Sequence, residues 1–165
     1  MSEKEQKLQE QVYPQLLLDT QLCFPLYACS KEIIRRYKPF LDALDLTYTQ
    51  YITMMVLWEE QRITVGELGH RLYLDSGTLT PLLRKLETAG YLVRERSEED
   101  ERVVEIRVTE EGMALREQVK DIPHRLGRNI MCGAGLTDEE VSQLYTLLYK
   151  VIKGTGEGDG NDASE

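Results

Sequence analysis

The chain has 165 residues, of which 41% are hydrophobic and 30% charged, a balance that predicts one soluble domain with a buried core. No apolar run approaches the ~20 residues that a membrane-spanning helix needs, and residues 1–11 lack the apolar stretch of a signal peptide. A cytoplasmic protein without membrane contact is therefore expected. The net charge of −9 argues against a protein that coats nucleic acid without sequence preference, but it permits a local basic surface.

The cysteines and histidines exclude several kinds of site. Three cysteines, Cys23, Cys29 and Cys132, are too few for a disulfide framework or a four-thiolate zinc site. His70 and His124 are far apart with no metal-ligand spacing around them. Neither a glycine-rich phosphate loop nor a Ser/His/Asp set is apparent, so we expect no metal, no cofactor and no enzyme.

The N-terminal part of the chain divides into a flexible tail over residues 1–14 and a helical region over residues 15–46. Apolar residues recur at helical spacing across residues 22–44. Pro25 and Pro39 are awkward inside a helix, so a bent or broken helix is expected here.

Residues 47–109 have the order of elements of a winged helix-turn-helix. Two helices begin with capping boxes, in which Thr47 is followed by Gln50 and Thr64 by Glu67. A third helix closes at a glycine, after which the apolar period changes from 3.6 to 2 and predicts a two-stranded hairpin around a charged loop. The predicted fold is mainly α with a small β-hairpin wing.

The third of these helices has the pattern of a DNA-recognition helix, which such a module places in the major groove. Four leucines at positions 79, 82, 83 and 86 are expected to pack inward. Taken alone, the remaining polar residues could be caps and solvated charges, but the hairpin directly after them favours DNA contact. The candidate DNA-binding residues are Ser76, Thr78, Thr80, Arg84 and Lys85 on the helix, and Arg94, Arg96, Asp100 and Arg102 on the wing.

The most specific prediction of DNA contact concerns two residues at the tip of the wing. Acidic and basic residues are nearly equal in number between residues 62 and 109, so binding must depend on a few well-placed cations and helix N-termini. Arg102 is expected to probe the minor groove, with Asp100 holding its guanidinium in place.

The C-terminal part continues with helices over residues 110–152, bent near Pro123, followed by an acidic disordered tail over residues 153–165. Helices at both ends of the chain are too long and too apolar for one small module to bury. They predict a homodimer, and a dimer of such units reads palindromic double-stranded operator DNA.

Three segments carry a resemblance to a known family. The wing sequence RERSEEDERVVEIRVTEEG is similar to that of MarR winged-helix regulators. The segments LCFPLYACSKEIIRRYKPFLDALDLTYTQY and LYLDSGTLTPLLRKLE resemble the organic-hydroperoxide repressors (OhrR type) within that family. The resemblance covers most of residues 16–152 and implies a repressor that leaves DNA when organic hydroperoxide oxidises Cys23. It assigns hydrogen bonds to the thiolate to Tyr27 and Tyr37. Pro25 departs from the aliphatic residues that are more usual at its position.

The two tyrosines differ in how they can reach the thiol. Tyr27 lies four residues after Cys23, on the same helical face. Tyr37 lies fourteen residues after Cys23, which corresponds to ~21 Å along a straight helix. A contact with Tyr37 therefore requires a folded helix or the partner subunit.

The fate of the oxidised thiol has two alternatives, a second cysteine or an external low-molecular-weight thiol. Cys29 lies ~9 Å along the helix from Cys23, beyond the reach of a disulfide, and is assigned as core filler. The family resemblance implies that Cys132, beside flexible glycines, is the candidate resolving cysteine in an intersubunit disulfide.

Three other functions compete with a peroxide-sensing repressor. The first is a MarR-type regulator that responds to a small phenolic ligand between its domains. The second is a thiol peroxidase at Cys23, which would need a reductant, although no Cys-X-X-Cys pattern is present. The third is a winged helix used only for protein contact, which the acidic charge favours and the recognition helix opposes.

Overall fold

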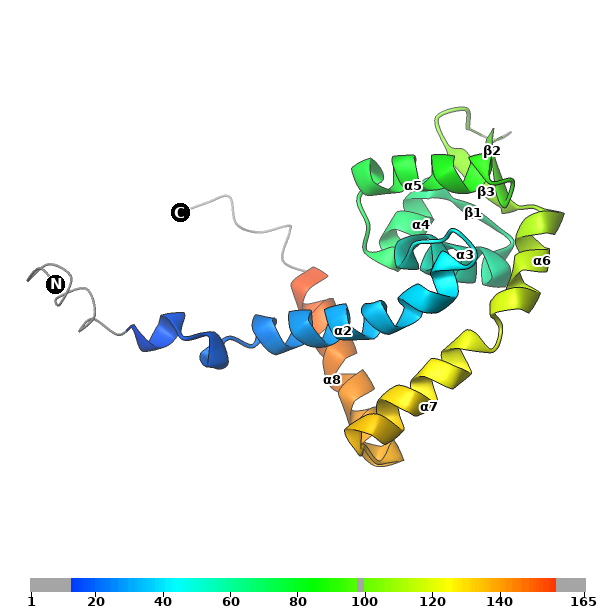
Figure 1. Ribbon diagram of the computed structural model, residues 1–165. Coiled ribbons are helices and arrows are strands. Elements are labelled where there is room, and N and C mark those ends of the chain that lie inside the picture. Colours follow the sequence, from blue (N-terminus) through cyan, green and yellow to red (C-terminus); the bar gives the residue numbers. More distant parts are fainter. Residues whose placement is uncertain (1–12, 98–99, 157–165) are drawn as a thin grey trace, which may run out of the picture. The chain divides into compact units, whose positions relative to one another are not determined.

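The computed structural model describes residues 13–97 and 100–156, without the side chains of residues 128–132. The chain forms two compact units, one ending at Val119 and the other beginning at Lys120. The elements of the first unit (Figure 1) are η1 (Pro14–Leu16), η2 (Leu18–Thr20), α2 (Cys23–Asp42), α3 (Tyr48–Glu60), β1 (Arg62–Thr64), α4 (Val65–Leu72), α5 (Ser76–Thr88), β2 (Leu92–Arg96), β3 (Val104–Val108) and α6 (Glu110–Val119). The second unit contains α7 (Ile122–Ala134) and α8 (Asp138–Gly156).

The helix-turn-helix pair is α4 and α5, and local sequence signals determine its ends. Both predicted capping boxes are present, at the start of α3 and of α4. Tyr73 takes a left-handed conformation with φ 54 after α4, which turns the chain sharply. Asp75 then caps α5, because its side chain accepts a hydrogen bond from the backbone N–H of Thr78. At the far end of α5, Gly90 has φ +80, a conformation that glycine adopts without strain.

The core of this unit is built from one face of each helix. All four predicted leucines of α5 are buried, and they pack in a region where α5 contacts α3, α4 and β2. Fully buried side chains from the other elements complete the core, namely Leu41, Tyr51, Met54, Leu57, Leu68, Leu92, Ile106 and Leu115. This packing holds α5 against the sheet with its polar face outward.

The wing is part of a three-stranded antiparallel sheet with the order β1-β3-β2. The predicted hairpin is confirmed, with Arg94 of β2 opposite Ile106 of β3. The third strand, β1, pairs with the other edge of β3, so that Ile63 also lies opposite Ile106. The prediction of a two-stranded wing was therefore incomplete, because three residues are too few to show a period of two.

The helices at the chain ends differ from expectation in one respect. Residues Cys23–Asp42 form a single helix, α2, so of the expected bend or break the break is absent. Pro25 occupies the first turn of α2, where backbone N–H groups have no partner within the helix. The predicted interruption near Pro123 is present, since α6 ends before α7 begins. Over the described residues, no helix is long and apolar enough to cross a membrane.

Candidate nucleic-acid interface and thiol site

The exposed face of α5 carries the five polar residues that the sequence pattern assigned to it, and all five are exposed. Its first turn is held by Asp75, whose carboxylate accepts hydrogen bonds from the backbone N–H of Thr78 and from the Thr78 hydroxyl, both at 2.9 Å. These two hydrogen bonds, the backbone one first, lower the pKa of Asp75 below its ordinary value. The cap is therefore ionised at neutral pH and holds the start of α5 rigid.

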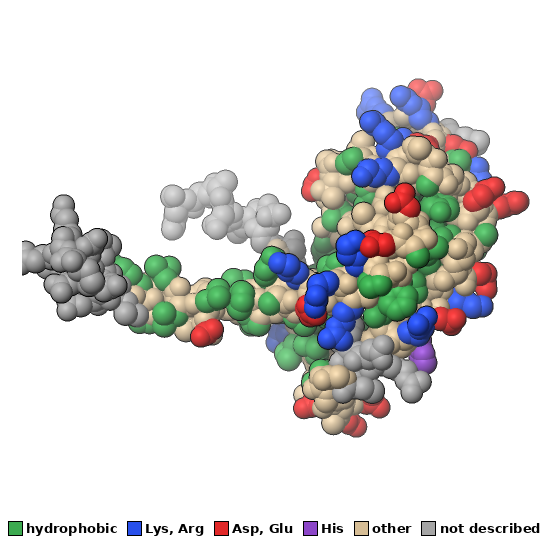
Figure 2. Space-filling view, in the orientation of Figure 1, with side chains coloured by type: hydrophobic (Ala, Val, Ile, Leu, Met, Phe, Trp, Pro, Cys, Tyr) green, Lys and Arg blue, Asp and Glu red, His purple; other side chains and the backbone are tan. Residues whose placement is uncertain are grey.

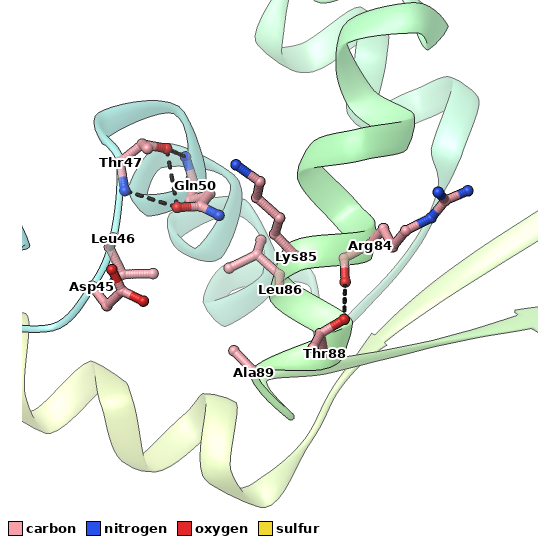
Figure 3. A pocket seen from close by; sticks show the side chains of 9 residues that line it. All are labelled: Asp45, Leu46, Thr47, Gln50, Arg84, Lys85, Leu86, Thr88 and Ala89. Carbon is pink, nitrogen blue, oxygen red and sulfur yellow. Dashed lines mark hydrogen bonds between the residues drawn. The ribbon is translucent and has the colours of Figure 1, made fainter.

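Two cations stand on the C-terminal half of α5. Arg84 and Lys85 are exposed, and neither takes part in an ion pair within the described part of the chain. Figure 3 shows that they diverge, with Lys85 directed toward Gln50 at the start of α3 and Arg84 pointing away from it. A pocket of about 540 Å³ lies between this half of α5 and the turn that leads into α3.

The base of the wing is tied to α5 by an ion pair. The Arg94 guanidinium Nε lies 3.0 Å from a carboxylate oxygen of Glu87, and the exposed fractions of the two side chains are 27% and 33%. The hydrogen bond from Arg94 lowers the pKa of Glu87 below its ordinary value. Since its charge is already paired, Arg94 positions the wing relative to α5, and its contact with DNA stays a prediction.

The tip of the wing presents Arg96, Asp100 and Arg102, all of them exposed. Asp100 accepts a hydrogen bond from the backbone N–H of Arg102 at 2.9 Å. It therefore shapes the turn, and the expected clamp on the Arg102 guanidinium stays a prediction. Figure 2 shows Lys and Arg side chains gathered at the end of this unit that carries α5 and the wing, with acidic side chains among them.

The candidate sensing thiol lies at a helix end. Cys23 is the first residue of the 20-residue helix α2 and is exposed in the chain. A helix N-terminus favours negative charge, and the thiolate is the nucleophilic form of cysteine. Cys29 is also exposed, so its assignment as core filler was wrong. Cys132 belongs to α7, but its side chain lies outside the described residues.

The two predicted tyrosine partners lie in different surroundings. Tyr27 is 62% exposed, and the ammonium group of Lys31 lies 5.7 Å from its ring centroid. Tyr37 instead joins an aromatic cluster, with its ring centroid 5.0 Å from that of Tyr48 and 5.8 Å from that of Tyr51. Because α2 is a single helix, Cys23 and Tyr37 of one chain are far apart.

Sequence reasoning missed this aromatic cluster. Tyr51 is buried, and this burial, with the nearby Tyr37 and Tyr48, raises the pKa of Tyr51 to about 12. The cluster continues to Trp58, whose ring lies 6.2 Å from Tyr51 and whose Nε1–H donates to the carbonyl of Gly112 at 2.7 Å. The available signal was the i, i+3 spacing of two tyrosines at the start of α3.

Solved structures of similar fold include regulators bound to DNA. AbfR of Staphylococcus epidermidis has been solved bound to DNA in reduced and overoxidized forms, each 30% identical over 92% of this chain and 98% of theirs, with a TM-score of 0.65. A disulfide form of AbfR is 29% identical over 90% of this chain and 96% of its own, with a TM-score of 0.57. A mutant MarR of Escherichia coli complexed with operator DNA is 27% identical over 79% of this chain and 92% of its own, with a TM-score of 0.72.

A helix-turn-helix followed by a β-wing, with exposed cations on both, defines a winged-helix transcriptional regulator that binds DNA. A family model described as transcriptional regulator SarA/Rot matches residues 35–119. The organic hydroperoxide resistance transcriptional regulator of Bacillus subtilis is 49% identical over 145 residues, which cover 87% of this chain and 95% of that protein. The chain belongs to the MarR family of winged-helix regulators, and within it to the organic-hydroperoxide repressor type.

Proposed function

We propose that this regulator is a redox-sensing repressor, which binds palindromic operator DNA as a homodimer and leaves it when organic hydroperoxide oxidises Cys23. The observation that carries the proposal is the position of Cys23, an exposed thiol at the first residue of a long helix. The 49% identity to a regulator named for organic hydroperoxide resistance supports the choice of oxidant.

The chemistry at Cys23 needs only the thiolate and the peroxide. The sulfur attacks one oxygen of the hydroperoxide, the O–O bond breaks, and the other oxygen leaves as an alcohol after taking a proton. Cys23 becomes a sulfenic acid, which condenses with a second thiol to give a disulfide and water. That second thiol is Cys132 of the partner subunit or an external low-molecular-weight thiol.

Hydrogen bonds from Tyr27 and Tyr37 are proposed to stabilise the thiolate. Tyr27 is one helical turn from Cys23 on the same helix, so it belongs to the same chain's site. Tyr37 has to come from the partner subunit, since the unbroken α2 separates it from the Cys23 of its own chain. Its packing against Tyr48 and Tyr51 fixes the position from which its hydroxyl would act.

The proposed dimer follows from apolar side chains that each unit leaves exposed. The N-terminal ones are Leu16, Leu17, Leu18, Leu22, Phe24 and Ile34, and those of α8 are Leu144, Tyr145, Leu147, Tyr149 and Val151. Large apolar side chains left exposed in such number are typical of a surface that another protein covers. A second copy that covers these residues also supplies the Tyr37 that the thiol site lacks.

Release from DNA is assigned to the disulfide rather than to oxidation of the sulfur alone. AbfR has been solved on DNA when overoxidized, and separately in a disulfide form, which supports this assignment. A Cys23–Cys132 bond between subunits would shift the terminal helices and change the separation of the two recognition helices, so that they no longer match both half-sites.

The test measures operator binding before and after treatment with cumene hydroperoxide, with non-reducing electrophoresis of the same samples. Wild type, Cys23→Ser, Cys132→Ser and Cys29→Ser are compared, the last as the matched control because Cys29 is also an exposed thiol of α2. Wild type and Cys29→Ser should lose DNA binding, and they should form a covalent dimer if Cys132 is the second thiol. Cys23→Ser should bind DNA and ignore peroxide.

The remaining variant separates the two fates of the sulfenic acid. If Cys132→Ser stays on DNA and forms no covalent dimer, Cys132 is the resolving thiol. If it is released by peroxide only when a small thiol is added, the external thiol caps Cys23. Release of Cys23→Ser by peroxide would contradict the proposal as a whole.

A response to a small ligand is the second candidate function, and the pocket beside α5 is the observation that favours it. The side chain of Gln50 is 7% exposed, and its amide oxygen is used in the capping box with Thr47. Its amide N–H₂ faces the pocket, as does the Lys85 side chain (Figure 3). Release of Cys23→Ser from operator DNA by an aromatic carboxylate would favour this function. If none of a set of small aromatic ligands releases this variant, the function is excluded.

A further inference from the structure

The centre of the exposed face of α5 carries one apolar side chain, that of Pro81. In an α-helix each residue is turned about 100° from the one before it. By this measure the direction opposite to the four buried leucines, which is the centre of the exposed face, lies within about 30° of four positions: Gly77, Pro81, Arg84 and Thr88. Pro81 is exposed at this centre, between a glycine one turn before it and Arg84 after it. Since Gly77 has no side chain, the proline ring stands clear on the surface that would meet a groove.

Pro81 is also unusual as a helix residue, because it lies within α5 rather than at its start. A proline there cannot donate to the carbonyl of Gly77 and costs helix stability. An alanine would restore the hydrogen bond and improve helix propensity. The ring therefore serves no purpose in folding α5 that alanine would not serve better.

The threonines of the same helix have already used their hydroxyl protons. Thr78 donates to a carboxylate oxygen of Asp75 at 2.9 Å, Thr80 to the carbonyl of Ser76 at 2.7 Å, and Thr88 to the carbonyl of Arg84 at 2.8 Å. Each acceptor is a carboxylate or carbonyl oxygen, so the hydroxyl must be the donor. Toward a binding partner, these threonines can therefore only accept hydrogen bonds through their hydroxyl oxygens and make apolar contacts through their methyl groups.

We propose that Pro81 determines sequence specificity by packing against the C5-methyl group of a thymine in the major groove. The inference rests on the proposed role of α5 as the helix that enters that groove. Among the four bases only thymine presents a methyl group there. The threonine oxygens near the ring accept from the N6 amino group of the paired or neighbouring adenine, whereas guanine offers them only acceptors.

The contact is tested by removing one methyl group from DNA. Duplexes that the reduced protein binds are selected from a random library, and each thymine in them is then replaced by deoxyuridine. Loss of a buried methyl should weaken binding about fourfold at one thymine in each half-site, the factor that corresponds to one methylene-sized group. Pro81→Ala should bind the thymine and deoxyuridine duplexes equally, at the affinity that wild type has for deoxyuridine.

Pro39→Ala is the matched control, since it makes the same change on an exposed position of α2. It should keep the wild-type ratio between the two duplexes. Binding by wild type that no deoxyuridine weakens would overturn the proposal. So would a ratio that Pro81→Ala leaves unchanged. Selection that yields no common sequence would instead refute the proposed operator binding, and the specificity of Pro81 with it.

Discussion

Among the described glycines, Gly112 is the one at which an added Cβ would lie nearest to another atom, so replacing it by alanine should destabilise the fold strongly. A Cβ at this position would lie 2.1 Å from the carbonyl oxygen of Tyr91 and 2.8 Å from Cγ2 of Val108. The Tyr91 carbonyl cannot move freely, because it also accepts a hydrogen bond from the backbone N–H of Thr109 at 3.1 Å. The carbonyl of Gly112 is held in turn by the indole of Trp58.

The cost follows from these contacts. Overpacking a well-packed site costs ~1–3 kcal/mol of folding free energy. The cost of Gly112→Ala is expected at the upper end of this range, because the atom nearest to the new Cβ belongs to the backbone and cannot move aside easily. The helix propensity of alanine returns at most ~1 kcal/mol, so a net loss of about 2 kcal/mol is expected from these two terms. Gly66→Ala is the matched control, since Gly66 lies in α4 and a Cβ there meets nothing within 4 Å.

Urea unfolding of the reduced protein measures both variants. Gly112→Ala should unfold at clearly lower urea than wild type, and Gly66→Ala at the same or slightly higher urea. Equal midpoints for Gly112→Ala and wild type would show that the junction of β2, β3 and α6 relaxes without cost, which would refute the packing argument.

Three further predictions concern α5 and the wing. Arg102→Ala should weaken operator binding by ~1–3 kcal/mol, the scale of a good groove contact, and unchanged affinity in a titration would show that the wing does not read DNA. Asp75→Ala should cost ~1 kcal/mol of stability in urea, because it removes the cap of α5; an unchanged midpoint would argue against the cap. Because Arg94 holds the pKa of Glu87 below its ordinary value near 4.5, their pair stabilises the fold above that value, and the stabilisation is lost as pH falls through the lowered pKa. Glu87→Gln should therefore be less stable than wild type at neutral pH, by ~1 kcal/mol or less, and the gap should close in acid. A gap that persists there would exclude ionisation of Glu87 as its cause.

The parts of the fold that the sequence predicts well are those with a local cause. A capping box joins two side chains three residues apart, so the starts of α3 and α4 were visible at Thr47 and Thr64. The buried leucines of α5 followed from helical periodicity in the same way. Each of these features depends on neighbours within one or two turns of chain.

The features that were missed depend on distant partners. β1 is a strand because it pairs with β3, and its three residues are too few to show the pattern of a strand in the sequence. Cys29 reads as core filler by residue type, yet it lies on an exposed position of α2 within its own chain.

The aromatic cluster joins the proposed thiol site to the base of the wing by direct contact. The ring of Tyr37 packs on that of Tyr51, and Tyr51 packs on Trp58. The Trp58 indole donates a hydrogen bond to the carbonyl of Gly112, and Gly112 lies against the backbone of Tyr91, the residue before β2. Close-packed side chains transmit displacement because they have no free volume to absorb it. Within the proposed function, a displacement of Tyr37 would therefore reach the base of the wing through these packed side chains. Gly112→Ala disturbs the far end of this path without altering any side chain on the exposed face of α5, so reduced operator affinity in that variant would show that the position of the wing base matters for binding.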